Sequence, residues 1–161
     1  MDLFKLYILL NDIFVTYPGT HTAAFGSGDS LTSGVYATGS AGSLTLDGGG
    51  GDTNAVFIIK FEGARTAAAS STIVLNSGTR SSNVYWIAEG AISIGANSVI
   101  KGNLFAHPGA VTLGAGCDIE GRLLTSEGAI TFGTDAIIPT DPITIPIRFS
   151  SNRPPSTAVG V

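Results

Sequence analysis

The chain has 161 residues, of which 12% are charged, and its eight Lys and Arg residues leave a formal net charge of −4. This length suits one domain with a sizeable core, and the lack of a basic stripe argues against nucleic-acid binding. A single cysteine, Cys117, excludes an intrachain disulfide framework, and 22 glycines favour tight corners over long amphipathic helices. We interpret Cys117 as a buried small apolar residue, not as a reactive thiol.

Apolar residues recur at helical spacing at the start of the chain, where Asp2 can cap a helix and Pro18-Gly19 can end it. We therefore predict a helix over about residues 2–15, lying along the rest of the fold. A secretory signal peptide is the alternative interpretation, but Asp2, Lys5 and Asn11-Asp12 do not suit one. No apolar run reaches membrane-spanning length without a polar interruption, so we expect no membrane insertion.

A less regular region follows, with short apolar segments bounded by glycine and polar residues, as is typical of strands. We predict strands over residues 31–36, 42–46, 54–61, 72–75 and 84–87. In the second of these, Thr45 lies between two leucines, in the same way as the hydroxyl residues of the repeats further along the chain. Gly63-Ala64-Arg65-Thr66 is another partial copy of that repeat, although Arg65 stands where an inward apolar residue is expected.

Three copies of one phrase, Gly90–Gly95, Gly109–Gly114 and Gly128–Gly133, then recur at a fixed interval, since 109 − 90 = 19 and 128 − 109 = 19. A constant period of this kind indicates stacked turns, each of which buries its apolar side against the next. Two further apolar segments follow the phrase in each turn. Three segments per turn predict a β-solenoid with a roughly triangular cross-section.

Successive side chains of a strand point to opposite faces, so the large apolar residues of each copy are predicted to point inward. The residues between them are small or carry a hydroxyl group and are predicted to point outward. They are Ala91, Ser93, Ala110, Thr112, Ala129 and Thr131. Thr66 and Thr45 hold the hydroxyl position in the two partial copies and complete the set of candidate surface residues.

The second segment of each turn places Ile100, Ile119 and Ile138 at the same interval, and we predict that all three point inward. Lys101 and Glu120 then occupy matching outward positions on adjacent turns. Leu104-Phe105 and Leu123-Leu124 form the third segment. Prolines interrupt the pattern after Asp135, which predicts a capping strand and then a loose tail over residues 151–161.

The predicted helix is followed by a series of phrases that, taken in this order, resembles the microbial ice-binding protein family. The phrases are Phe25-Gly26-Ser27-Gly28, Leu31-Thr32-Ser33-Gly34-Val35-Tyr36, Leu44-Thr45-Leu46-Asp47-Gly48-Gly49, Asn54-Ala55-Val56-Phe57-Ile58, Asn83-Val84-Tyr85-Trp86 and the glycine-alanine repeats. The resemblance covers about Asp2 to Pro139. It implies a mainly β fold over residues 1–150, a right-handed β-solenoid with one flanking α-helix. It also implies a location outside the cell or on its surface, with no cofactor and no catalysis.

The resemblance implies a function as well, because members that bind ice do so through a flat solenoid face, often with a Thr-Ala/Gly-x-Thr/Asn phrase. In Gly109-Ala110-Val111-Thr112 and its two counterparts the first residue of this phrase is Gly and the last is Thr or Ser, and the substitution at the first position predicts weaker activity. We predict an antifreeze-type protein whose partner is the ice crystal surface. The alternative is an adhesive or carbohydrate-binding cell-surface module without ice activity. Its candidate aromatic residues are Tyr85 and Trp86, of which only one can face outward.

An enzyme would need clustered carboxylates or a metal site. Asp118, Glu120 and Arg122 form the densest polar cluster, but Lys101 beside Glu120 makes an exposed charge ladder the better interpretation. The histidines, His21 and His107, lack metal-ligand spacing, and the run Gly48 to Gly51 lacks the Gly-Lys-Ser/Thr of a phosphate loop. We therefore expect neither catalysis nor a metal.

Family domains usually begin with further strands before the helix, whereas this chain begins at the helix. Either it is a fragment of a longer protein, or its fold is shortened. Missing turns would leave a strand edge uncovered, so we expect self-association through that edge.

Overall fold

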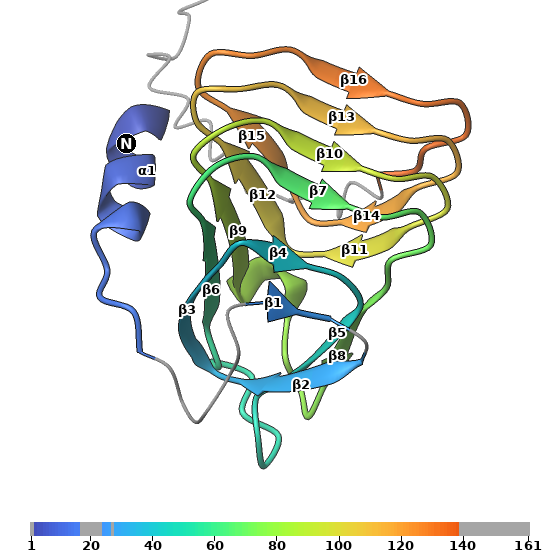
Figure 1. Cartoon of the computed structure of the whole chain (residues 1–161). Helices are drawn as coiled ribbons and strands as arrows, with labels where there is room; N and C mark the ends of the chain where they lie inside the picture. Colours follow the sequence, from blue (N-terminus) through green and yellow to red (C-terminus); the bar gives the residue numbers. More distant parts are fainter. Residues whose placement is uncertain (1, 17–23, 27, 139–161) are drawn as a thin grey trace, which may run out of the picture.

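A computed structural model describes residues 2–16, 24–26 and 28–138 of the chain. These residues form a mainly β structure of parallel sheets with one α-helix packed at the side (Figure 1). The predictions made for Pro18-Gly19, for His21 and for the segment from Pro139 through the tail at 151–161 fall outside the described residues.

The strands stack into three walls around a common core, and neighbouring strands within each wall pair in parallel. The helix-side sheet consists of β3 (Gly34–Thr38), β6 (Phe57–Phe61), β9 (Val84–Ala88), β12 (Asn103–Ala106) and β15 (Leu123–Thr125). The repeat sheet consists of β7 (Arg65–Ala67), β10 (Ile92–Ile94), β13 (Val111–Leu113) and β16 (Ile130–Phe132). The short strands β4 (Ser40–Ala41) and β1 (Ala24–Phe25) pair with each other, and β4 lies next to β7.

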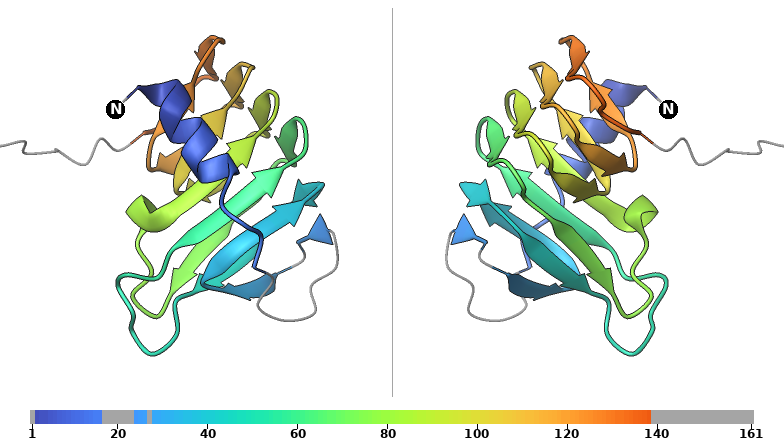
Figure 2. Two further views of the ribbon diagram at one scale, coloured as in Figure 1. Left: turned by 90° about the vertical axis from the view of Figure 1, so that its left-hand side faces the viewer. Right: turned by 90° about the vertical axis from the view of Figure 1, so that its right-hand side faces the viewer.

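The third wall contains two sheets, β2 (Asp29–Thr32) with β5 (Leu44–Asp47) and β8 (Ile73–Asn76), and β11 (Val99–Lys101) with β14 (Asp118–Glu120). A bridge between Thr72 and Val99 connects them. A single 3-10 turn, η1 (Ser81–Asn83), precedes β9. Because the chain visits the three walls in turn, each circuit stacks on the one before it (Figure 2).

Inward side chains from all three walls form one apolar core. The inward positions predicted from strand parity are buried in the first two copies of the phrase and in the second segment: Ile92, Ile94, Val111, Leu113, Ile100 and Ile119 are buried, and Ile138 is partly buried against them. In the third copy Ile130 and Phe132 keep the inward register but are exposed, because they lie in the last strand of their sheet. Cys117 is also fully buried, and its Sγ lies 3.2 Å from the carbonyl oxygen of Gly95. The nineteen-residue period therefore does place one apolar layer on the next.

The predicted helix is present but shorter than expected, because α1 spans Leu3–Asn11. Asp2 caps it, accepting a hydrogen bond of 3.3 Å from the backbone N–H of Phe4. Lys60 of β6 donates hydrogen bonds to the carbonyl oxygens of Asn11 and Ile13, which stabilises the end of the helix at this point. The apolar spacing continues beyond this point, but Phe14 is almost fully exposed. Contact with the sheet, and not the spacing alone, sets the length of the helix.

Helix α1 covers the outward face of the helix-side sheet. Tyr7 and Leu10 pack on outward apolar side chains contributed by four successive strands of that sheet. These are Val35, Ile58, Ile87 and Phe105. A second small core thus lies outside the coil, between helix and wall.

One predicted strand is divided in two. Residues 31–36 were expected to be continuous, but β2 ends at Thr32 and β3 begins at Gly34. The chain turns a corner there, and Gly34 has a φ of 157°. Strand propensity identified the residues but not the corner between the two walls.

Candidate functional site

The outward face of the repeat sheet carries a column of hydroxyl side chains. Thr66, Ser93, Thr112 and Thr131 are direct partners across four adjacent strands, and all four are exposed. Neighbouring strands lie about 4.8 Å apart, so the hydroxyl groups repeat at that interval. The structure thus brings together all four hydroxyl residues predicted for this phrase.

A second column, of alanines, runs beside the hydroxyl column. The backbone N–H of Ile92 donates to the Ala110 carbonyl at 2.9 Å, and that of Val111 donates to the Ala129 carbonyl at 3.0 Å. These bonds hold Ala91, Ala110 and Ala129 in step with the strands. Ala91 and Ala129 are exposed, and Ala110 is half-buried. Methyl and hydroxyl groups therefore alternate across the face.

Thr45 does not lie on this face. It belongs to β5 in the third wall, where its partners are Ser30 and Val74. Its sequence neighbours Leu44 and Leu46 point inward as expected. Parity correctly separates inside from outside, but it does not specify which of three walls a strand joins.

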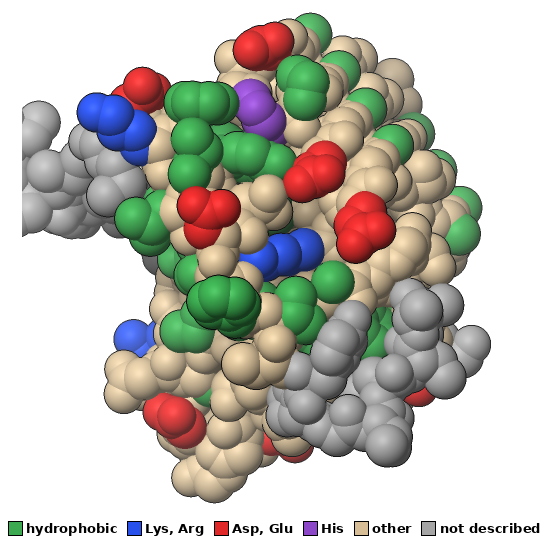
Figure 3. Space-filling model, turned by 60° about the vertical axis from the view of Figure 1, so that its left-hand side comes forward, with side chains coloured by type: hydrophobic (Ala, Val, Ile, Leu, Met, Phe, Trp, Pro, Cys, Tyr) green, Lys and Arg blue, Asp and Glu red, His purple; other side chains and the backbone are tan. Residues whose placement is uncertain are grey.

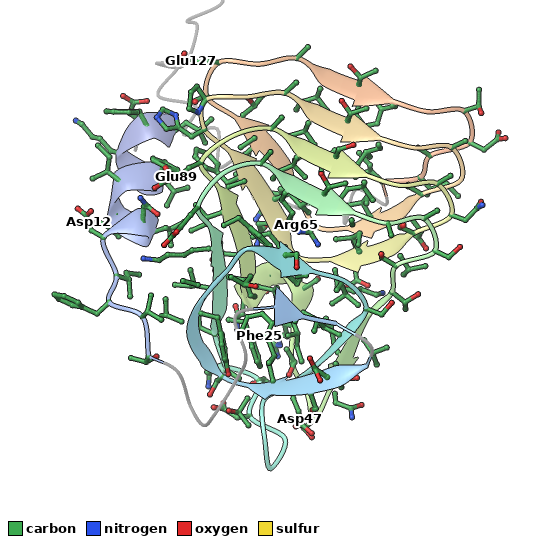
Figure 4. All side chains as sticks on the ribbon, in the orientation of Figure 1. Asp12, Phe25, Asp47, Arg65, Glu89 and Glu127 are labelled. Atoms are coloured by element: carbon green, nitrogen blue, oxygen red, sulfur yellow. The ribbon has the colours of Figure 1, made fainter. Side chains whose placement is uncertain are left out.

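Arg65 lies inside the coil, directly next to the hydroxyl column (Figure 4). It pairs with Ile92, so the partial copy at 63–66 is in register with the repeats after all. Its guanidinium carbon lies 4.5 Å from the ring centre of Trp86 and 5.5 Å from that of Phe61. None of its guanidinium nitrogens has a hydrogen-bond partner among the described residues. Burial lowers the pKa of Arg65 to about 10, so the side chain stays protonated at neutral pH.

The outward face of the repeat sheet is electrically neutral. β10, β13 and β16 contain no charged residue, and the one charged residue of β7 points inward. The third wall differs, because Lys101 and Glu120 form the predicted ion pair across β11 and β14. Hydrogen bonds from Lys101 and Ser81 lower the pKa of Glu120.

Two columns of glycine border the repeat sheet where the chain turns its corners. A methyl group on Gly109 would lie 2.5 Å from the backbone nitrogen of Ala91, and one on Gly114 would lie 2.6 Å from that of Ala96. Contacts this short would force the turns apart. Glycine at the first position of the phrase, which the sequence presents as a missing threonine, therefore has a structural cause. Only the distance between turns reveals it.

Comparison with known proteins now identifies the family. The family model described as ice-binding-like matches residues 12–138 of the chain. The chain belongs to the ice-binding-like family. Ice-binding protein 1 of Shewanella frigidimarina (strain NCIMB 400) is 43% identical over 82 residues, a match that covers 47% of this chain and 9% of that protein.

Solved structures of ice-binding proteins share the fold. An ice binding protein from an Antarctic bacterium of the Flavobacteriaceae is 40% identical with a TM-score of 0.76, covering 83% of this chain and 32% of that chain. One from the Antarctic ascomycete Antarctomyces psychrotrophicus is 28% identical with a TM-score of 0.73, covering 84% of this chain and 67% of that one. The chain thus spans about a third of the Flavobacteriaceae protein and a small part of the Shewanella protein.

Within the described residues of this family member, no group of three or more His, Cys, Asp or Glu side chains is placed to hold a metal ion. The polar cluster predicted at 118–122 is divided, since Glu120 pairs with Lys101 while Arg122 lies beyond the corner, beside the helix-side sheet. His107 packs on Tyr7, with ring centres 4.2 Å apart, and hydrogen-bonds through Nδ1 to Ser126 Oγ. The described part of the chain has no helix long and apolar enough to cross a membrane.

Neither aromatic candidate for sugar stacking lies on the repeat sheet. Trp86 points into the core and donates from Nε1 to the Lys101 carbonyl at 2.9 Å. Tyr85 is half-buried in a mainly apolar hollow of about 190 Å³ between α1 and the helix-side sheet, next to Leu10 and Arg122. This volume is below the range of about 300–1,000 Å³ that is usual for ligand pockets.

Proposed function

We propose that the chain adsorbs to ice through the uncovered outward face of its repeat sheet. The observation that carries the proposal is the register of Thr66, Ser93, Thr112 and Thr131 across four strands, beside the alanine column. This face is uncharged and repetitive, and relatives of the chain are ice-binding proteins. Thr45 takes no part, because it lies on another wall.

The chemistry of an ice surface also favours the outward face of the repeat sheet as the binding surface. An ice surface presents uncharged water molecules at regular intervals, so a complementary protein surface needs methyl and hydroxyl groups at regular intervals. Charged groups would instead hold their own water shells. Hydrogen-bonded strands fix the backbone, alanine has no rotamers to lose, and threonine is already restricted at χ1. Binding therefore costs little conformational entropy, and many weak contacts add up to firm adsorption.

The finer description of the fold belongs to the same proposal. Three walls around one core support a triangular β-solenoid, and parallel crossover connections are right-handed in about 98% of cases. Because ice that threatens a cell first grows outside it, the proposal also places the protein in the extracellular space or on the cell surface.

Ice recrystallisation in the presence of the purified chain tests the function. We expect the wild-type chain to slow recrystallisation and to shape growing crystals. Thr112→Tyr is expected to abolish both effects, because a large ring in the middle of the column holds the remaining groups away from the lattice. A circular dichroism melt should show that this variant stays folded.

Val74→Tyr is the matched control, since Val74 is an outward, exposed residue of β8 in the third wall. It adds the same ring elsewhere and should leave activity unchanged. An equal loss of ice activity in both variants would show that the effect of the added ring does not depend on the face that carries it. Unimpeded ice growth with the wild-type chain would rule out the function and leave the fold as it stands.

A further inference from the structure

β14, β15 and β16 are the last strands of the coil at one of its ends (Figure 1). This end exposes apolar side chains whose counterparts in the preceding turns are buried. Ile130 and Phe132 occupy the inward register of Val111 and Leu113. They are 37% and 52% exposed, against 0% and 2% for their partners. Ile138, the inward residue at the same end of the third wall, is half-buried, whereas its counterparts Ile119 and Ile100 are fully buried. The core is therefore open at this end, and we call this surface the open end.

The strand edges at the open end are also available for pairing. Among the described residues, no strand pairs with the outer edge of β15 or of β16. Proteins usually protect such edges with lysine, proline or a bulge, but Leu123-Leu124-Thr125 and Ile130-Thr131-Phe132 contain neither of these residues. At the opposite end, Thr16 bridges to Val35 of β3, and its N–H donates to the Val35 carbonyl at 2.9 Å. Within the described part of the chain, Thr16 therefore covers the edge of β3, and no residue pairs with the outer edges of β15 and β16.

The charges around β15 point to a particular partner. Arg122 precedes the strand and Glu127 follows it, both are exposed, and neither forms an ion pair with a described residue. The turn before has Asn103 and Pro108 at the corresponding positions, 122 − 19 and 127 − 19. Opposite charges at the two ends of one strand become complementary when that strand pairs antiparallel with a copy of itself. Glu127 lies at the open end in Figure 4.

We propose that two copies of this chain associate end to end about a two-fold axis, with β15 of each copy paired antiparallel to β15 of the other. Arg122 of each copy then comes within reach of Glu127 of the other. The same axis exchanges the other two walls, so the inward Phe132 of one copy meets the inward Ile138 of its partner. A two-fold axis through β16 instead would bring Glu127 of one copy next to Asp135 of the other, where like charges repel.

Sedimentation velocity of the full chain tests this proposal, which does not depend on ice adsorption. We expect the wild-type chain to sediment as a dimer. The double variant Ile130→Lys with Phe132→Lys should weaken the dimer at least about tenfold, because it places charges in the apolar contact. Val74→Lys, on the lateral face of the third wall, is the matched control and should leave the dimer intact.

A charge-swap series keeps the proposal testable if the double variant fails to fold. Glu127→Arg alone should weaken the dimer, because it sets like charges opposite each other. Arg122→Glu combined with Glu127→Arg should restore it. Failure of the restoration would overturn the pairing through β15, and a dimer that survives both lysines would overturn the open end as the interface.

A monomeric wild-type chain overturns the proposal outright. Hydrogen exchange then identifies the reason. Protected amides in β15 and β16 of a monomer would mean that another part of the same chain covers the edge. Oligomers larger than a dimer would exclude the closed two-fold arrangement.

Discussion

The helix-side sheet and the repeat sheet have the same backbone plan and opposite outward faces. Both are parallel, both are in register, and both alternate apolar inward residues with outward ones. The outward residues of the helix-side sheet include Val35, Ile58, Ile87 and Phe105, and α1 covers these four. Those of the repeat sheet are threonine, serine and alanine, and no described element covers them. Outward side chains, and not the architecture, decide which wall becomes interior and which one meets the environment.

The apolar character of the helix-side region does not end at the helix. Phe4, Ile8 and Leu9 of α1 are exposed on its outer side, and Figure 3 shows hydrophobic side chains gathered over this part of the molecule. The repeat sheet instead exposes its methyl groups singly, each beside a hydroxyl group. Covered and uncovered walls thus differ in how apolar groups are distributed, as well as in their number.

Phe105→Ala removes a packing contact between α1 and the helix-side sheet and should have the largest effect on stability. Phe105 is buried under α1, and its ring centre lies 5.4 Å from that of Tyr7. Its loss leaves a cavity between helix and sheet and should lower the free energy of unfolding by about 3–5 kcal/mol. Urea denaturation followed by circular dichroism measures this. Thr112→Ala, on the uncovered wall, is the comparison and should change stability by less than about 0.5 kcal/mol. Similar losses of stability in both variants would mean that the two walls contribute equally to the free energy of unfolding.

Arg65→Met alters the inner side of the repeat sheet and should stabilise the protein by about 1–4 kcal/mol. Burial lowers the pKa of Arg65 to about 10, so the side chain is charged at pH 7, and its nitrogens have no hydrogen-bond partners in the described part of the chain. The contacts with the rings of Trp86 and Phe61 contribute about 2 kcal/mol or somewhat more, and we expect the several kcal/mol that burying an unpaired charge costs to exceed this. Urea denaturation at pH 7 decides the sign. A less stable variant would mean that contact with the rings outweighs desolvation.

Periodicity alone predicts how the turns from residue 90 onward stack, because two identical intervals specify which residues lie on one another. Ile100, Ile119 and the outward threonines follow directly from it. Thr45 shows the limit: alternation is a local property, whereas the wall that a strand joins depends on the corners before it. The helix end at Asn11 depends on Lys60, which is distant in sequence, and no local pattern contains that contact.

The same alternation in the sequence predicts most of the candidate site, but it does not explain Arg65 or the glycine columns. The alternation of hydroxyl and apolar residues places Ser93, Thr112 and Thr131 on one face. The inward position of Arg65 follows from its register with Ile92, but the arginine contradicts the expected residue type and only its ring contacts explain it. The glycine columns depend on distances between turns, which a sequence does not contain.

Gly114→Ala tests how closely the turns of the uncovered wall must approach each other. The added methyl group would lie 2.6 Å from the backbone nitrogen of Ala96, so neighbouring strands must separate. We expect a loss of about 1–3 kcal/mol in the free energy of unfolding. Gly39→Ala is the matched control, because a methyl group there meets no atom within 4 Å. Equal stability of the two variants would show that neighbouring turns can separate without lowering the free energy of unfolding. It would then weaken the case for a rigid face.

Glu120→Gln tests the third wall, whose outward face carries the Lys101–Glu120 ion pair and neither a covering helix nor the hydroxyl column. Lys101 and Glu120 are partly exposed, so solvent screens their attraction and the loss at pH 7 should stay below about 1 kcal/mol. Because the pKa of Glu120 is lower in the folded protein than in the unfolded chain, its contribution is present above the unfolded pKa and disappears as the pH falls through the folded pKa. Thermal melts of both proteins between pH 7 and pH 3 should therefore converge towards low pH, and added salt at pH 7 should narrow the gap in the same way. A gap that is unchanged by acid and by salt would mean that Glu120 acts through packing, and the third wall would then resemble the covered wall more than a charged one.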